Sequence, residues 1–138
     1  MKKSIKAILS ISLISIVGML IFASTVLASS TSYTSSLYME ANSSHSGSSR
    51  TYNERNHSIS LYELTSTNAD LEIELIKKNL FSSSTVYTGT VNIRNANTTY
   101  SKYMGNHDTG KYYYLFSTFG KSNCGKINAN PVTMTSYN

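Results

Sequence analysis

The chain has 138 residues, with 12 Lys and Arg against 7 Asp and Glu, and a formal net charge of +5. Three of the cations, Lys2, Lys3 and Lys6, lie at the N-terminus, and without them the net charge is only +2. The other cations are scattered, and only Lys77 and Lys78 are adjacent. Because nucleic-acid-binding domains present a basic cluster or stripe, the sequence argues against DNA or RNA as a partner.

Residues 1–28 have the pattern of a signal peptide. The three lysines form a positive n-region, an uncharged and mostly apolar run follows over Ala7–Ala28, and Val26-Leu27-Ala28 forms a cleavage site before Ser29. We therefore predict cleavage after Ala28 and a secreted protein, either extracellular or at the cell surface. If cleavage fails, the run is long enough to anchor the chain in a membrane, with the later residues still outside.

After residue 28 the composition favours strands. Ser, Thr, Asn and Tyr make up more than half of these residues. Thr and Tyr favour strands, whereas Ser and Asn favour turns. The low net charge and the regularly spaced apolar residues argue against intrinsic disorder. The length suits one domain with one core.

In chain order we expect a flexible polar start at residues 29–36 and then one β-sandwich domain over residues 37–138. The predicted strands cover residues 37–41, a short edge strand at 50–54, then 57–64, 71–77, 85–93, 111–119 and 131–136, with a strand or short crossover at 100–104. The clearest is Leu71–Lys77, where Leu71, Ile73 and Leu75 alternate with two glutamates. Polar loops are expected at residues 42–49 and 120–130, and turns elsewhere.

About seven or eight short antiparallel strands at this spacing indicate an all-β sandwich, with a small closed barrel as the alternative. The inward positions of the predicted strands define the expected core. Its members are Leu37, Met39, Ile59, Leu61, Leu71, Ile73, Leu75, Val91, Ile93, Tyr114, Phe116 and Val132.

One short motif resembles an enzyme block. Gly105-Asn106-His107-Asp108 is similar to the GNHD/E block of calcineurin-like metallophosphoesterases, in which Asn and His ligate divalent metals. That family also has two upstream Asp blocks, whereas the aspartates here are Asp70 and Asp108 alone. The histidines lack zinc-ligand spacing. We interpret the motif as a hairpin loop and predict no catalytic residue, metal ligand or cofactor, so the protein is expected not to be an enzyme.

Cys124 is the single cysteine, so an internal disulfide is excluded. We interpret it as a half-buried residue of the loop over residues 121–126. An intermolecular disulfide or a reactive thiol is the alternative.

Tyrosine is the strongest hint of function. The chain has 11 Tyr and no Trp, and tyrosines form stacking or adaptable contact surfaces. We predict a contact surface that includes Tyr38, Tyr62, Tyr112 and Tyr113. Its partner would be a cell-wall polymer, a polysaccharide or a protein. Capping of a thin core by the tyrosines is the alternative.

Two functions remain open. The first is a non-enzymatic binding or interaction protein at or outside the cell envelope. The second is a secreted antibacterial protein, bacteriocin-like or toxin-like. His57-Ser58-Ile59-Ser60 is similar to the His-Ser strand of the lactococcin-972 type of exported bacteriocin. That resemblance implies a small β-sandwich with antibacterial action, although the group contains Trp and this chain has none.

Overall fold

The computed structural model describes residues 29–138, so the predicted signal peptide at residues 1–28 lies outside the described residues. The strands of the described part are β1 (Ser30–Met39), β2 (Ser44–Ser46), β3 (Arg50–Tyr52), β4 (Asn56–Glu63), β5 (Ala69–Lys78), β6 (Ser83–Ile93), β7 (Thr98–Asn106), β8 (Gly110–Ser117) and β9 (Ile127–Tyr137). This part of the chain contains no helix, and therefore none that could cross a membrane.

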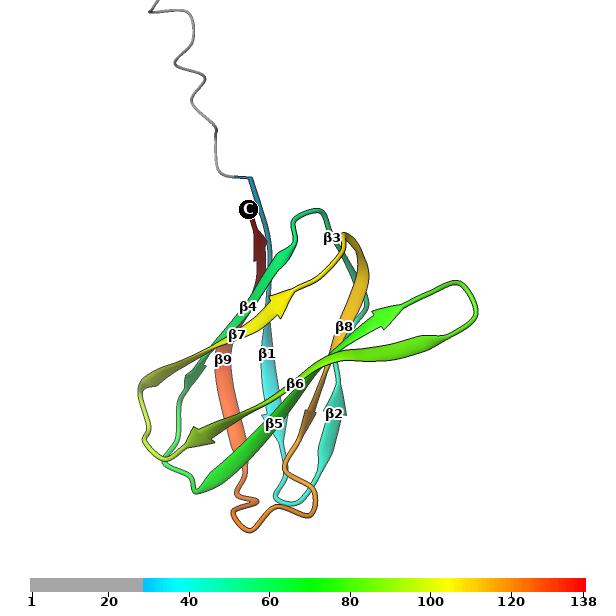
Figure 1. The fold of residues 1–138 in the computed structure, drawn as a ribbon. Helices are drawn as coiled ribbons and strands as arrows, with labels where there is room; N and C mark the ends of the chain where they lie inside the picture. The colour runs from blue at the N-terminus through cyan, green and yellow to red at the C-terminus, as the bar shows by residue number, and fades with distance from the viewer. Residues whose placement is uncertain (1–28) are drawn as a thin grey trace, which may run out of the picture.

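The strands form two antiparallel sheets. A four-stranded sheet has the order β1-β9-β4-β7, and a five-stranded sheet has the order β2-β8-β5-β6, with β3 also paired to β8. The two sheets lie face to face, as Figure 1 shows. The chain is therefore the predicted all-β sandwich rather than a closed barrel.

Alternating burial explains why these segments form strands. In β5, Leu71, Ile73 and Leu75 are fully buried, while Glu72 and Glu74 between them are half-buried on the outer face. Every side chain of the predicted core is buried in one cluster between the sheets. The core also contains residues outside the predicted set, among them Tyr52, Met104, Tyr112, Ile127 and Ala129. Packing between the two sheets thus holds the domain without an internal disulfide.

β1 begins earlier than predicted. Residues 30–36, expected as part of a flexible polar start, lie in β1 and pair with β9. The hydroxyls of Ser32 and Thr135 form a hydrogen bond across this pair at 2.8 Å. This half of the strand has almost no apolar residues, so hydrophobic alternation gave no signal there. Its order comes from backbone pairing and from cross-strand hydroxyl contacts.

Two other strands reach into segments that were expected to be loops. β2 lies within residues 42–49, and β9 begins at Ile127, within the loop expected at residues 120–130. Pro131 was predicted to start the last strand, but it lies inside β9. At that position the pairing of β9 shifts register against both β1 and β4. Such an irregularity accommodates a residue without a backbone N–H.

Candidate functional site

The four tyrosines of the predicted contact surface do not come together. Tyr38 on β1 and Tyr62 on β4 point outward from the four-stranded sheet, with β9 between their strands. Tyr113 on β8 points outward from the five-stranded sheet. Tyr112 is only 1% exposed and belongs to the core. The prediction was wrong for Tyr112, because it has the same inward orientation as Tyr114 and Phe116 on its strand.

A different surface feature stands out at the turn between β5 and β6. Figure 1 shows this hairpin projecting beyond the rest of the sandwich. At its tip, Leu80 is 87% exposed and Phe81 is 95% exposed. The turn is closed by the N–H of Asn79, which donates to the carbonyl oxygen of Ser82 at 2.9 Å. We call residues 79–82 the hairpin tip. It presents two bulky apolar side chains that make almost no contact with the domain.

Lysines surround the base of the hairpin tip. Lys78 and Lys111 are exposed and line a shallow hollow of about 280 Å³ together with Asn79 and Leu80. Neither lysine forms an ion pair within residues 29–138. The adjacent Lys77 is partly buried and lies 3.8 Å from a carboxylate oxygen of Asp108. No acidic residue occurs over residues 75–85, so this part of the surface is both apolar and cationic.

A buried histidine on β4 lies among aromatic rings. His57 has no exposed surface, and its ring centroid is 4.9 Å from that of Tyr112, 5.1 Å from Tyr52 and 5.7 Å from His107. Neither ring nitrogen of His57 has a hydrogen-bond partner among the described residues. Burial lowers the pKa of His57 to about 4, and nearby His107 acts in the same direction while Glu54 opposes it. The folded protein therefore holds His57 neutral.

Glu54 occupies a polar position where the first and last strands meet. Its carboxylate accepts hydrogen bonds from the hydroxyls of Ser29 and Ser136, the latter at 2.7 Å. Hydrogen bonds from Ser29, Ser136 and Thr31 lower the pKa of Glu54 to about 2. These hydrogen bonds keep the carboxylate ionised. They also link the start of the described chain to β9, so Glu54 stabilises the fold.

The residues of the Gly105–Asp108 motif also make contacts within the domain. His107 Nε2 donates to the carbonyl oxygen of Met104 at 2.7 Å, and Asp108 accepts from Arg55 at 3.2 Å. Asn106 donates to the side chain of Asn56 at 3.0 Å. Within residues 29–138, no three His, Cys, Asp or Glu side chains are grouped closely enough to hold a metal ion. Each polar side chain of this motif is engaged in holding the β7–β8 connection.

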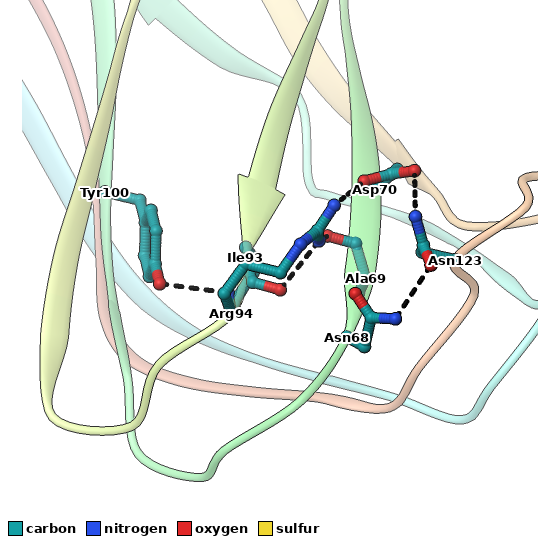
Figure 2. Close-up of polar contacts among 7 residues, drawn as sticks. All are labelled: Asn68, Ala69, Asp70, Ile93, Arg94, Tyr100 and Asn123. Atoms are coloured by element: carbon teal, nitrogen blue, oxygen red, sulfur yellow. Dashed lines mark hydrogen bonds and ion pairs between the residues drawn. The ribbon is translucent and has the colours of Figure 1, made fainter.

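A polar network at the far end of β5 from the hairpin tip is shown in Figure 2. Arg94 pairs with Asp70 at 2.5 Å, and Asn123 donates to the other carboxylate oxygen of Asp70 at 2.9 Å. Asn68 donates to Asn123 at 2.7 Å, and the backbone N–H of Arg94 donates to the Tyr100 hydroxyl at 3.0 Å. Hydrogen bonding from Arg94 is the main reason that the pKa of Asp70 is lowered. The network joins three loops and leaves Asp70 with its hydrogen bonds satisfied.

Two further features are small. Cys124 is a half-buried free cysteine, as expected, and its backbone bridges to Ala69.

A cavity of about 80 Å³ opens between β1 and the β2–β3 edge, with Tyr33 and Phe116 in its wall. Pockets for small organic ligands are about 300–1,000 Å³. The volume of this cavity lies below that range, and the hairpin tip remains the most distinctive surface of the described residues.

Comparison with known proteins gives weak likenesses in structure alone. The backbone resembles a chain described as the crystal structure of PirA, with a TM-score of 0.45 and 13% identity, over 77% of this chain and 94% of that chain. It also resembles a chain from the structure of infectious bursal disease virus Gt strain, with a TM-score of 0.44 and 13% identity, over 80% of this chain and 32% of that chain. No family model matches the sequence, and no curated protein matches it.

Proposed function

We propose that this protein is exported and acts without catalysis, by contact at or outside the cell envelope. The observation that supports this proposal is the hairpin tip. Leu80 and Phe81 are neighbours in sequence and are almost completely exposed. They lie in the turn of the β5–β6 hairpin, which projects from the body of the domain (Figure 1). Single exposed apolar residues are common on soluble proteins. An adjacent Leu-Phe pair at the end of a projecting hairpin adds nothing to the core, and contact with a partner is the role that accounts for it.

Acidic and histidine side chains that a catalytic site would need are engaged in contacts within the domain. Glu54, Asp70, His107 and Asp108 all have partners within the domain. Their contacts hold strands and loops in place, which favours a rigid scaffold that displays a contact surface. The tyrosine stacking surface receives less support, because the four tyrosines lie on different faces or in the core.

Export is tested by the N-terminus of the protein recovered from the culture medium. Mass spectrometry is expected to give a chain that begins at Ser29. A chain that begins at Met1 and remains in the membrane fraction would contradict cleavage and favour the anchored alternative.

The contact role is tested by retention on intact cells and on isolated envelope material. A Leu80→Ser, Phe81→Ser variant is expected to lose retention. The matched control is Leu64→Ser, Phe119→Ser, which makes the same change of composition at exposed residues elsewhere. Circular dichroism and thermal unfolding are expected to be the same for all three proteins. Equal retention of the tip variant and the control would contradict the proposed role of the hairpin tip.

The secreted antibacterial role is the second candidate. It is favoured by the same observation, because a protein that attacks a target cell surface would also present an apolar tip beside lysines, here Lys78 and Lys111, which form no ion pair in the described part of the chain. Killing of a sensitive strain by the purified protein, with loss of killing in the tip variant and not in the control, would assign this role. Retention on cells without killing favours the binding role.

A further inference from the structure

We propose that the partner of the hairpin tip is an anionic lipid surface, into which Leu80 and Phe81 insert while Lys78 and Lys111 contact lipid phosphates. The inference rests on the proposed function, since it names the partner of the same contact. The hairpin between β5 and β6 projects beyond the body of the sandwich (Figure 1). The two apolar side chains in its turn, Leu80 and Phe81, are almost completely exposed. A projecting tip can enter the interfacial region of a bilayer while the rest of the domain stays in water.

The order of side chains along the hairpin matches the layers of a membrane surface. The outermost residues are Leu80 and Phe81, which suit the boundary between headgroups and acyl chains. Directly behind Leu80, Lys78 and Lys111 line the hollow of about 280 Å³. Long lysine side chains place their ammonium groups at the headgroup level while their methylenes cover apolar surface. The remaining residues of the turn, Asn79 and Ser82–Ser84, are polar and uncharged.

Charge favours an anionic surface. Lys78 and Lys111 form no ion pair within the described part of the chain, and residues 75–85 contain no acidic side chain. Asp108 pairs with Arg55 and Lys77, and Glu74, on the same strand as Lys78, accepts a hydrogen bond from Thr85. Each lysine close to an anionic membrane adds an attraction that corresponds to about fivefold in affinity. A phosphate headgroup in the hollow would meet two ammonium groups and no competing carboxylate.

A tryptophan at the tip gives a direct measurement, because the full chain contains no Trp. Phe81→Trp places the single fluorophore at the tip, and Phe119→Trp places it at another exposed position, 67% exposed and at the opposite end of β8 from Lys111. Both proteins are mixed with vesicles of phosphatidylcholine alone or of equal parts phosphatidylcholine and phosphatidylglycerol. For the tip fluorophore we expect a blue shift, and quenching by brominated acyl chains, with the anionic vesicles. The control fluorophore is expected to show neither change.

Affinity for the anionic vesicles is then compared among variants. Leu80→Ser, Phe81→Ser is expected to weaken binding by at least about tenfold, since two apolar side chains lose their burial. Lys78→Gln is expected to weaken it by about fivefold. Lys126→Gln removes the same formal charge from a lysine that is paired with Glu40 elsewhere on the surface, and it is expected to leave binding nearly unchanged. Equal effects of Lys78→Gln and Lys126→Gln would overturn the assignment of lipid phosphates to the hollow.

The vesicle and cell experiments separate the two levels of the proposal. If the tip variant loses retention on cells while the tip fluorophore does not respond to either vesicle, the partner is a protein or a polymer, and the lipid inference is overturned while the proposed function stands. If the tip variant keeps full retention on cells and the fluorophore does not respond, both are overturned. A response to both vesicle types of equal strength would overturn the requirement for anionic lipid.

Discussion

Replacing His57 with Phe is expected to remove most of the acid sensitivity of this protein between pH 6.5 and pH 4. His57 is fully buried, and its pKa falls from 6.5 in the unfolded chain to about 4 in the folded protein. Between these values the unfolded chain binds a proton that the folded protein does not. The contribution of His57 to stability is therefore complete above pH 6.5 and is lost progressively as the pH falls to 4.

The expected size of this loss is large for a small domain. Each unit of pKa difference corresponds to about 1.4 kcal/mol, so a fall from 6.5 to about 4 corresponds to roughly 3 kcal/mol. Domains of this kind are stable by about 5–15 kcal/mol in total. Phe is expected to fit among Tyr52, Tyr112 and His107. It removes two buried nitrogens that have no hydrogen-bond partner among residues 29–138. An unsatisfied buried polar group costs about 1–3 kcal/mol, so the variant is expected to be no less stable than the wild type above pH 6.5.

Urea unfolding over this pH range measures the effect directly. The wild type is expected to lose roughly 3 kcal/mol of unfolding free energy more than His57→Phe. The control is His45→Gln, which alters an exposed histidine on β2 and is expected to keep the wild-type pH dependence. If His57→Phe and the wild type lose the same stability between pH 6.5 and pH 4, the acid sensitivity does not come from a neutral buried His57, and the reasoning is wrong.

Three further changes test the fold. Ile73→Ala is expected to lower the unfolding free energy, measured in urea, by about 2–5 kcal/mol, because Ile73 is fully buried. The control Leu80→Ala, at the exposed tip, is expected to change it by less than about 0.5 kcal/mol. Similar losses in both variants would show that the orientation of the strand is misassigned. Gly105→Ala is expected to cost about 1–3 kcal/mol in the same measurement, because Gly105 has φ +96° and a Cβ there would lie 2.7 Å from His107 Nε2. An unchanged unfolding free energy would contradict that strain. Glu54→Gln is expected to reduce the loss of stability between pH 4.5 and pH 2, since the pKa of Glu54 is lowered from 4.5 to about 2 and its stabilising effect disappears as the pH falls through that range. A variant that keeps the wild-type acid profile would assign that loss to other carboxylates.

The sequence predicted the sandwich and its core wherever apolar residues alternate. Leu71, Ile73 and Leu75 predicted both the strand and its buried face. Successive side chains of a strand point to opposite faces, so apolar residues at every second position mark the face that is buried. The same reasoning failed for residues 30–36, where Ser and Thr pair with β9. Hydrogen bonding between distant strands leaves no local pattern in the sequence. The early start of β1 could therefore be found only in three dimensions.

The candidate site was predicted poorly, for a different reason. Tyr112 shares the inward orientation of Tyr114 and Phe116, so alternation alone was enough to place it in the core rather than on a contact surface. The sequence also predicts a turn at Leu80–Ser84, and residues 80–82 do form the turn, whereas Ser83 and Ser84 belong to β6. The projection of this hairpin was not visible in the composition. Leu80 and Phe81 are exposed because β5 and β6 extend beyond the neighbouring strands. The length of that extension depends on which residues of distant strands pair with each other, and the local sequence does not show this.

The pairing of β1 with β9 has a consequence for the time at which the domain can fold. Ser32 and Thr135, whose hydroxyls are bonded across this pair, are 103 residues apart in the chain. Closing so long a loop is entropically costly, and domains rich in such distant pairings fold slowly. The β5–β6 hairpin needs only its own residues, but the four-stranded sheet has to wait until β9 is available to join β1 and β4. A chain that leaves the ribosome N-terminus first would therefore stay incompletely folded until nearly all of it had been released.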